Sequence, residues 1–389
     1  MLLFHFLVDK EKALCYNSVA NKLFGGNFMK LVICGDMSIT GGSYKSFDEI
    51  DTKTAFNDVL DVFAQGDRVI VNLECALTES DHKIPKKGPN LKGPKNSADT
   101  LKAAGVTDCA LSNNHIYDYG REGLKDTLEQ LDRVGLKYTG IGKNYEDSRK
   151  NHTIVVDGIT VTIVNVCEHE YTYATDIREG ARPFDEFETM DDIRKAKASA
   201  DYVIVIYHGG KEYCRYPSPR LTKACREMVR CGADVVLCQH SHIIGVYEKF
   251  EGAHIMYGQG NFHFVKYLDK DFWQEGLIAL LDVTREGIDI DFIPVKAKDD
   301  GIRLASEEEK AKIMGDLWAR SESMRDGTWI DGWREFVATV ETNYRKHAGF
   351  TVDATSDEYQ MFAHYLDCEA HTDVWRELFK TWNHTNELD

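Results

Sequence analysis

Several histidine, carboxylate and asparagine side chains stand directly after short apolar runs, at the points where predicted strands end. They are Asp36, Glu74, Asn113, Asn114, His115, His208, His240 and His242. If these strands are largely parallel, their carboxyl ends meet at one edge of the sheet, where α/β proteins place their sites. Imidazole nitrogens together with carboxylate and amide oxygens suit Mn, Fe or Zn. The pattern therefore predicts a site for one or two divalent ions.

Each of these signals also has a simpler explanation. A single Asp or His after a strand is commonly a turn or cap residue, and Asn113–Asn114 alone is compatible with a left-handed turn. His240 and His242 lie on one side of the chain if it is extended there. Because five separate strand ends carry such residues, a shared metal site is the favoured interpretation.

The segments that would position these side chains alternate between strand-like and helix-like character. The predicted strands cover 31–34, 68–73, 108–112, 153–156, 160–166, 202–207, 235–238 and 254–257. Apolar residues recur at helical spacing in 121–134 and 218–231, with Gly135 and Gly232 as stops, and Ser97 is a candidate cap for a helix before Gly105. Strands near 277–283 and 288–293 follow each other directly, which predicts an antiparallel pair. This alternation indicates an α/β fold with a largely parallel sheet.

Three regions are predicted along the chain. Residues 1–28 form an N-terminal extension, either a tail or a mis-assigned start, because Met29 directly precedes the first strong strand. Residues 29–305 form the α/β domain. Residues 306–389 read as helical, acidic and rich in tryptophan, and no chemistry stands out there. We expect this extension to cover the core or to make an oligomer contact through its helices.

The overall charge excludes some classes of partner. The formal net charge is -17, whereas nucleic-acid binding needs a basic face, so no nucleic-acid partner is expected. Ten cysteines are scattered without a CxxC pair, which favours buried reduced thiols and a cytoplasmic location. Neither a signal peptide nor an apolar stretch long enough to span a membrane is visible.

The segment 80–97 is locally basic in this acidic chain. It is a predicted loop containing three prolines and the lysines Lys83, Lys86, Lys87, Lys92 and Lys95. Two explanations stay open: a solvated loop, or a loop that steers anions towards a site.

The order of the motifs resembles that of the CapA family. The specific blocks are Asn-Asn-His-x-x-Asp-x-Gly at 113–120 and His-x-Gly-x-Glu at 208–212, and shorter matches lie at 34–36, 71–74, 232–236, 240–242 and 257–262. The resemblance covers about residues 30–300. It implies a branch of the calcineurin-like metallophosphoesterases, built as a four-layer αββα sandwich, and a link to capsule poly-γ-glutamate synthesis.

The resemblance also implies roles for individual residues. Metal ligands would be Asp36, Glu74, Asn114, His208, His240 and His242, with Glu74 or Asp36 bridging two ions. His115 would protonate the leaving oxygen, and Asp118 would orient it. Asn113, Glu212 and Asn261 would contact substrate or support the ligands, or make structural hydrogen bonds only.

Two positions depart from the family pattern. Ser38 stands where many metallophosphoesterases carry a ligand histidine, which leaves a mononuclear site open, and Gly209 replaces an aromatic residue. The leading hypothesis is a metal-dependent phosphoester hydrolase that acts on an anionic small molecule or polymer. The alternatives are a non-catalytic metal-binding subunit of a polymer synthesis or export complex, and a metal-dependent amide hydrolase of γ-glutamyl polymer.

Overall fold

Two mixed β-sheets form the body of the molecule. The computed structural model describes residues 28–348 and 355–385, with side chains up to residue 380. The first sheet contains β1 (Phe28–Ser38), β2 (Arg68–Leu73), β5 (Asp108–Ala110), β6 (Lys137–Thr139), β15 (Asn261–Phe264), β16 (Glu275–Thr284), β17 (Ile288–Lys298) and β18 (Gly301–Leu304). The second contains β8 (His152–Val156), β9 (Ile159–Cys167), β11 (Tyr202–His208), β12 (Val235–Gln239), β13 (Tyr247–Phe250) and β14 (Ala253–Met256).

The strands that carry the candidate residues run parallel within each sheet. In the first sheet β1 pairs with β2, and β2 with β5, in parallel register. In the second sheet β11 pairs in parallel with β9 and β12. Antiparallel strands lie towards the edges, including the predicted β16–β17 pair. The carboxyl ends of β1, β2 and β5 and those of β11 and β12 are thereby brought to one end of the molecule.

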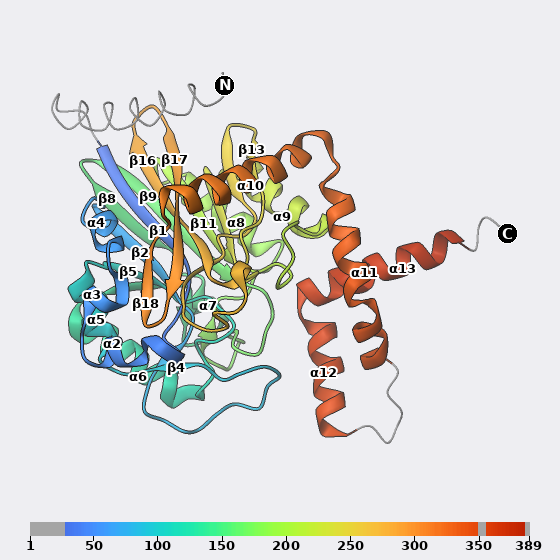
Figure 1. Cartoon of the computed structure of the whole chain (residues 1–389), viewed down its shortest axis with the longest axis horizontal. Helices are drawn as coiled ribbons and strands as arrows, with labels where there is room; N and C mark the ends of the chain where they lie inside the picture. Colours follow the sequence, from blue (N-terminus) through green and yellow to red (C-terminus); the bar gives the residue numbers. More distant parts are fainter. Residues whose placement is uncertain (1–27, 349–354, 386–389) are drawn as a thin grey trace.

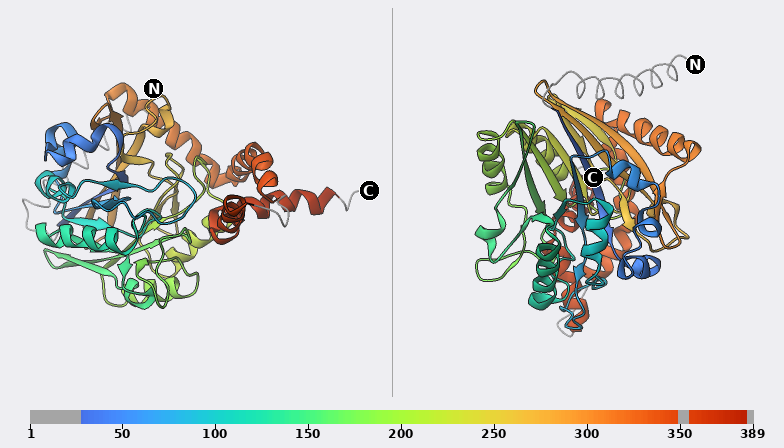
Figure 2. Two further views of the ribbon diagram at one scale, coloured as in Figure 1. Left: turned by 90° about the horizontal axis from the view of Figure 1, so that it is seen from below. Right: turned by 90° about the vertical axis from the view of Figure 1, so that its left-hand side faces the viewer.

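The two sheets pack face to face, and helices cover both outer faces. Apolar side chains from both sheets form one cluster between them, including Leu31, Ile33, Val161, Ile204 and Leu237. The right-hand view of Figure 2 shows the two sheets side by side. The outer face of the first sheet is covered by α2 (Tyr44–Asp48), α3 (Thr52–Phe56), α4 (Val59–Phe63), α5 (Ser97–Ala104) and α6 (Gly120–Val134). The second is covered by α8 (Glu188–Lys197) and α9 (Pro219–Arg230). The predicted four-layer αββα arrangement is confirmed.

Local sequence signals explain several helix ends. Helix α9 begins with Pro219 after Ser218, whose hydroxyl accepts a hydrogen bond from the Leu221 N–H. Helix α6 ends at Gly135, whose φ of 72° is the left-handed conformation that glycine adopts readily. The predicted cap at Ser97 is wrong: Ser97 is the first residue of α5, its hydroxyl has no hydrogen-bond partner, and Asn96 is the residue before the helix.

Short elements connect the larger ones. They are β3 (Ala76–Leu77), β4 (Lys92–Gly93), β7 (Ile141–Gly142), β10 (Gly180–Ala181), α7 (Tyr145–Ser148) and the 3-10 turns Gly41–Ser43 and Asp271–Trp273. Strands β3 and β4 pair with each other, and β4 lies within the predicted basic loop 80–97, which is therefore not entirely loop.

Four helices follow the sheets. Helix α10 (Glu307–Asp326) begins at a capping box formed by Ser306 and Glu309, and its Ile313 and Leu317 join the core between the sheets. Helices α11 (Trp329–Ala348), α12 (Ser356–Asp367) and α13 (Glu369–Thr385) project to one side of the body (Figure 1). They have an apolar cluster of their own around the buried Trp333. The division at residues 305/306 stays a prediction, and residues 1–27 of the predicted N-terminal extension lie outside the described residues.

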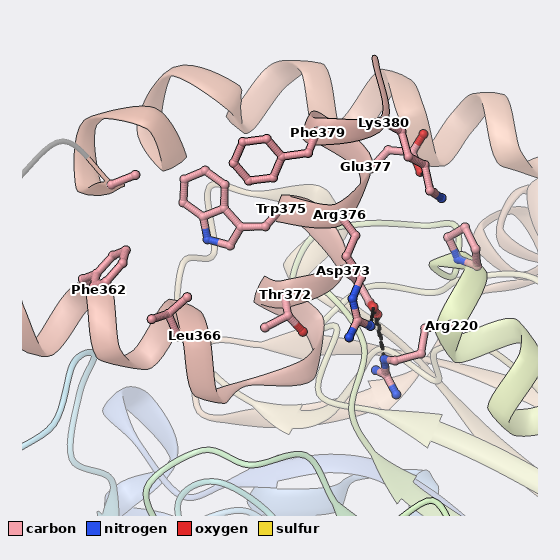
Figure 3. A pocket seen from close by; sticks show the side chains of 12 residues that line it. Arg220, Phe362, Leu366, Thr372, Asp373, Trp375, Arg376, Glu377, Phe379 and Lys380 are labelled. Atoms are coloured by element: carbon pink, nitrogen blue, oxygen red, sulfur yellow. Dashed lines mark hydrogen bonds and ion pairs between the residues drawn. The ribbon is translucent and has the colours of Figure 1, made fainter. Parts of the chain in front are cut away.

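An ion pair fastens α13 to the second sheet's helix layer. Nε of Arg220 lies 3.0 Å from Oδ2 of Asp373 (Figure 3). The same oxygen also accepts a hydrogen bond from the Ser218 hydroxyl. Beside this pair lies a cavity of about 790 Å³, lined in part by Trp375 and Phe379. An oligomer contact through these helices stays a prediction.

The structure also tests the predictions about cysteines and membrane-spanning helices. The nine cysteines in the described part of the chain are buried and free, as expected for reduced thiols. Among the described helices, none combines the length and apolar character needed to cross a membrane. The cytoplasmic location stays a prediction.

Candidate metal centre

Residues from both sheets converge where their parallel strands end. Asp36 lies in β1, Glu74 follows β2, His208 ends β11, and His240 and His242 follow β12. Both latter histidines have positive φ angles, 78° and 54°. Non-glycine residues seldom adopt this conformation, and it commonly marks functional sites. The sharp turn after β12 thus directs two imidazoles towards the first sheet.

Asp36 is the point at which the two sheets meet. It is fully buried, and its Oδ1 accepts a hydrogen bond of 2.8 Å from Asn72 Nδ2. Its Oδ2 accepts a 2.9 Å hydrogen bond from the His240 backbone N–H. Nδ1 of His208 and Nδ1 of His242 each lie 3.5 Å from its oxygens. Burial alone would raise the pKa of Asp36, but His208 and the other histidines outweigh it and lower that pKa.

Glu74 is buried without a hydrogen bond to its carboxylate. Its carboxylate is inaccessible to solvent, and neither oxygen has a hydrogen-bond partner. Its Oε1 lies 3.6 Å from His208 Nε2 and 3.9 Å from His115 Nε2. Burial, together with repulsion from Asp36, raises the pKa of Glu74 well above its usual value. A buried carboxylate of this kind is costly unless a cation satisfies it.

Two groups of ligand atoms share this carboxylate. One consists of Glu74, His208 and His240, and the other of Asp36, Glu74 and His242; within each group the ligand atoms lie within 4.8 Å of one another. Nδ1 of His240 also lacks a hydrogen-bond partner. The donor set and its unsatisfied atoms therefore fit a divalent metal centre. Ser38, two residues after Asp36 at the end of β1, has a buried hydroxyl without a hydrogen-bond partner.

Asn114 and Asn113 play different parts in the loop after β5. Oδ1 of Asn114 lies 3.0 Å from His208 Nε2, at the centre. Asn113 instead donates to Asn72 Oδ1 and to the Leu73 carbonyl, at 3.1 and 2.9 Å. Its Oδ1 accepts from the His115 N–H, so every polar atom of its amide group shapes the backbone around the centre.

His115 and Asp118 form a close pair at the edge of the centre. Nδ1 of His115 lies 2.6 Å from Asp118 Oδ2, and Lys86 Nζ lies 2.5 Å from Asp118 Oδ1. Burial, and then the positive charge of Lys86, lower the pKa of His115 despite Asp118. Lys86 is 2% exposed, so this part of the basic loop is neither solvated nor available to steer anions from solution.

Asn261 and Glu212 lie on the side of His242. Asn261 Oδ1 is 2.9 Å from His242 Nδ1, and its Nδ2 donates to the Trp273 carbonyl. This fixes the imidazole with Nε2 directed away from Asn261. Glu212 Oε1 lies 4.0 Å from that Nε2, and its side chain is 37% exposed, which places it where the centre opens to solvent.

Two residues at the metal centre, Asn72 and Glu170, were not predicted from the sequence. Asn72 lies inside β2, and its Nδ2 contacts both Asp36 and His208 Nδ1, the latter at 3.0 Å. Glu170 is buried and accepts a 2.5 Å hydrogen bond from Asn114 Nδ2, while His240 Nε2 lies 3.9 Å away. Glu170 follows the end of β9 by three residues, the same signal that identified the other candidates.

Comparison with known proteins agrees with this arrangement of motifs. Residues 30–266 match the model of the family described as bacterial capsule synthesis protein PGA_cap. The chain belongs to this family.

Two curated relatives and one solved structure illustrate the similarity. Capsule biosynthesis protein CapA of Bacillus anthracis is 27% identical over 315 residues, which cover 76% of each chain. PGA biosynthesis protein CapA of Bacillus subtilis is 29% identical over 247 residues, 62% of this chain and 65% of that protein. A 5′-nucleotidase precursor from Thermus thermophilus is 14% identical, with a TM-score of 0.40, over 77% of this chain and 59% of that one.

Proposed function

We propose that this chain is a metal-dependent phosphoester hydrolase that acts in capsule, poly-γ-glutamate or a related cell-envelope polymer pathway. The observation that carries the proposal is the buried Glu74 carboxylate, which has no hydrogen-bond partner and is shared by two groups of ligand atoms. The residues that would hold the metal are Asp36, Glu74, Asn114, His208, His240 and His242. Mn, Fe or Zn, as one or two ions, would suit these donors.

Bound cations would lower the pKa of a water molecule and neutralise charge on phosphoryl oxygens. The chain's own contribution is to position a proton donor. Because Asp118 holds Nδ1 of His115, Nε2 is the ring atom that can pass a proton to a leaving oxygen when the imidazole is protonated on both nitrogens. Asp118 orients the ring, and Lys86 holds Asp118 in turn. His115 and Asp118 are therefore the proposed catalytic pair.

The pathway is proposed from the relatives. Their printed names refer to capsule and PGA biosynthesis, which supports a role beside polymer-synthesis machinery. The substrate would be an anionic small molecule or polymer. With a net charge of -17, the protein as a whole repels anions, so the metal centre would have to supply the local attraction.

One observation favours a second candidate function. Ser38 stands, buried and unpartnered, where many metallophosphoesterases carry a ligand histidine. A centre that binds its second metal ion weakly would suit a non-catalytic subunit whose metal binds the carboxylates of a polymer. Amide hydrolysis of γ-glutamyl polymer would use the same metal chemistry on another bond.

One experiment separates these candidates. The purified chain is analysed for metal, then loaded with Mn²⁺, Fe²⁺ or Zn²⁺ and assayed on an aryl phosphate, an aryl phosphodiester and polyglutamate. Phosphoester hydrolysis that requires both metal and His115 supports the proposal. Metal-dependent polyglutamate binding without hydrolysis under any of these ions would overturn it in favour of the second candidate, and release of glutamate would favour amide hydrolysis.

A further inference from the structure

A second group of ligand atoms lies where α12 and α13 meet the loop after β9. Glu170, Cys368 and His371 each offer one ligand atom, and these atoms lie within 4.8 Å of one another. His364 lies beside this group: its Nε2 is 3.4 Å from Glu170 Oε1, and its ring centroid is 4.5 Å from that of His371. We call these four residues the junction cluster.

The junction cluster has the composition of a zinc site rather than of a surface acidic patch. It combines one thiol, two imidazoles and one carboxylate, and Cys368 is completely buried. Sulfur and imidazole donors favour Zn²⁺ among common biological divalent ions, and three protein ligands are enough to hold it. We propose that Glu170, Cys368 and His371, with His364 beside them, form a zinc-type cation site that fastens the C-terminal helices to the α/β body.

Neighbouring contacts determine which carboxylate is available to this site. Glu168 Oε2 is 3.7 Å from Cys368 Sγ, but Glu168 is already paired with Arg220 Nη2 at 2.7 Å. Glu369 is likewise held by His169 Nδ1 at 2.5 Å. Glu170 has no such pairing with Arg or Lys among the described contacts, and its Oε1 faces His364. Glu170 is therefore the carboxylate near the thiol and the imidazoles that no described arginine or lysine ion pair neutralises.

The surrounding residues also orient the donors. The Tyr344 hydroxyl contacts His371 Nδ1, which fixes that ring and leaves Nε2 for another partner. Burial, and then the charges of Glu170 and Glu168, raise the pKa of the Cys368 thiol well above its usual value. On binding a cation, the S–H bond would break, its proton would pass to solvent, and the thiolate would bond to the metal.

The junction cluster adjoins the candidate metal centre through one residue. Glu170 Oε2 accepts from Asn114 Nδ2 at 2.5 Å, whereas its Oε1 faces His364. A cation in the junction cluster would therefore connect α12 and α13 to the loop after β9, which is distant from them in sequence. This loop supports the candidate metal centre through Glu170. This inference does not depend on the proposed hydrolase activity.

Sulfur distinguishes the two sites experimentally. The candidate centre contains only nitrogen and oxygen donors, so a thiolate-to-cobalt charge-transfer band can arise only where a cysteine binds the ion. The full chain is stripped with a chelator and reloaded with Co²⁺ alone. We expect a near-ultraviolet thiolate band in the wild type, and we expect Cys368→Ser to remove it together with one bound ion per chain.

A matched control and a second variant complete the test. Cys231→Ser removes another buried thiol that lies beside a carboxylate, Glu227 at 4.0 Å, and should keep the band. His371→Ala should also lose one ion per chain, and it carries the test if Cys368→Ser does not fold. Cobalt uptake by the wild type without a thiolate band would overturn the proposal, as would a full band and full ion content in folded Cys368→Ser or His371→Ala. Failure of the hydrolase proposal alone would leave the band intact.

Discussion

Nδ1 of His115 lies 2.6 Å from Oδ2 of Asp118, and the other oxygen of that carboxylate is held by Lys86. A carboxylate fixed on both sides holds the imidazole in one tautomer and one orientation. Nε2 of His115 is then directed to the metal centre, 3.9 Å from Glu74 Oε1. This geometry gives His115 a role that does not require it to bind metal.

The first prediction separates that role from metal binding. His115→Ala should lower phosphoester turnover by roughly two to four decades, the usual contribution of a general acid, while metal content stays at the wild-type value. Steady-state rates and elemental analysis measure the two quantities. His82→Ala, which alters a histidine that is 87% exposed in the basic loop, should change neither. Unchanged turnover in His115→Ala would remove this residue from the mechanism.

The second prediction concerns the unpartnered carboxylate. Glu74→Gln should sharply reduce metal binding, because the residue belongs to both groups of ligand atoms. It should not destabilise the metal-free protein, because the carboxylate makes no hydrogen bond that the amide would lose. Added metal should therefore raise the melting temperature of the wild type but not that of the variant. Equal thermal stabilisation of both proteins by metal would show that Glu74 is not a ligand.

Position along the strands explains how much of the centre could be predicted from sequence. Glu74, His208 and His240 each follow or end an apolar strand, and parallel pairing alone brings such ends together. Asp36 differs from the prediction, because β1 continues past it to Ser38. Asn113 has the same sequence signal as Asn114, yet its amide bonds to Asn72 and to backbone atoms. Sequence spacing identifies the loop but not the direction in which each side chain points.

The contacts between the helical extension and the α/β body could not be predicted from the sequence. His364, Cys368 and His371 reach Glu170 only because α12 and α13 fold back against the loop after β9. The helical periodicity of 306–389 indicates helices but not which part of the body they contact. Long-range docking depends on ion pairs such as Arg220–Asp373, which have no local pattern. For this reason no chemistry stood out in the extension from its sequence alone.

The third prediction concerns the hydrogen bond by which Asn261 orients His242, a proposed metal ligand. Asn261→Ala removes the 2.9 Å contact to His242 Nδ1 and should weaken metal affinity by about 10–100-fold, the usual cost of losing a residue that orients a ligand histidine. Competition with a chromophoric chelator measures the change. Asn96→Ala, whose amide bonds to the exposed Asp48 carbonyl, serves as the control. Wild-type affinity in Asn261→Ala would show that Asn261 makes a structural hydrogen bond only.

The last prediction concerns stability in acid and uses a carboxylate at the opposite end of β5. Asp108 is 2% exposed; His152 Nε2 lies 2.7 Å from its Oδ1, and Arg68 Nε donates to its Oδ2 at 2.8 Å. Burial raises the pKa of Asp108, but His152, Arg68 and Thr107 outweigh this and lower it. A carboxyl group whose pKa is lower in the folded state stabilises the fold above its unfolded value of about 3.9. That contribution is lost as pH falls through the folded value.

Asp108→Asn should accordingly lower the free energy of unfolding at pH 7 by about 1–3 kcal/mol. The difference from wild type should shrink as the pH falls below about 4, because Asp108 takes up a proton first in the unfolded chain and then, at lower pH, in the folded one. Urea denaturation at both pH values measures it, with Asp61→Asn as the control on α4. If the difference in unfolding free energy between wild type and Asp108→Asn were the same at neutral and acidic pH, the charge of Asp108 would not stabilise the fold. A stabilising charge must make this difference smaller in acid, because the charge is lost there.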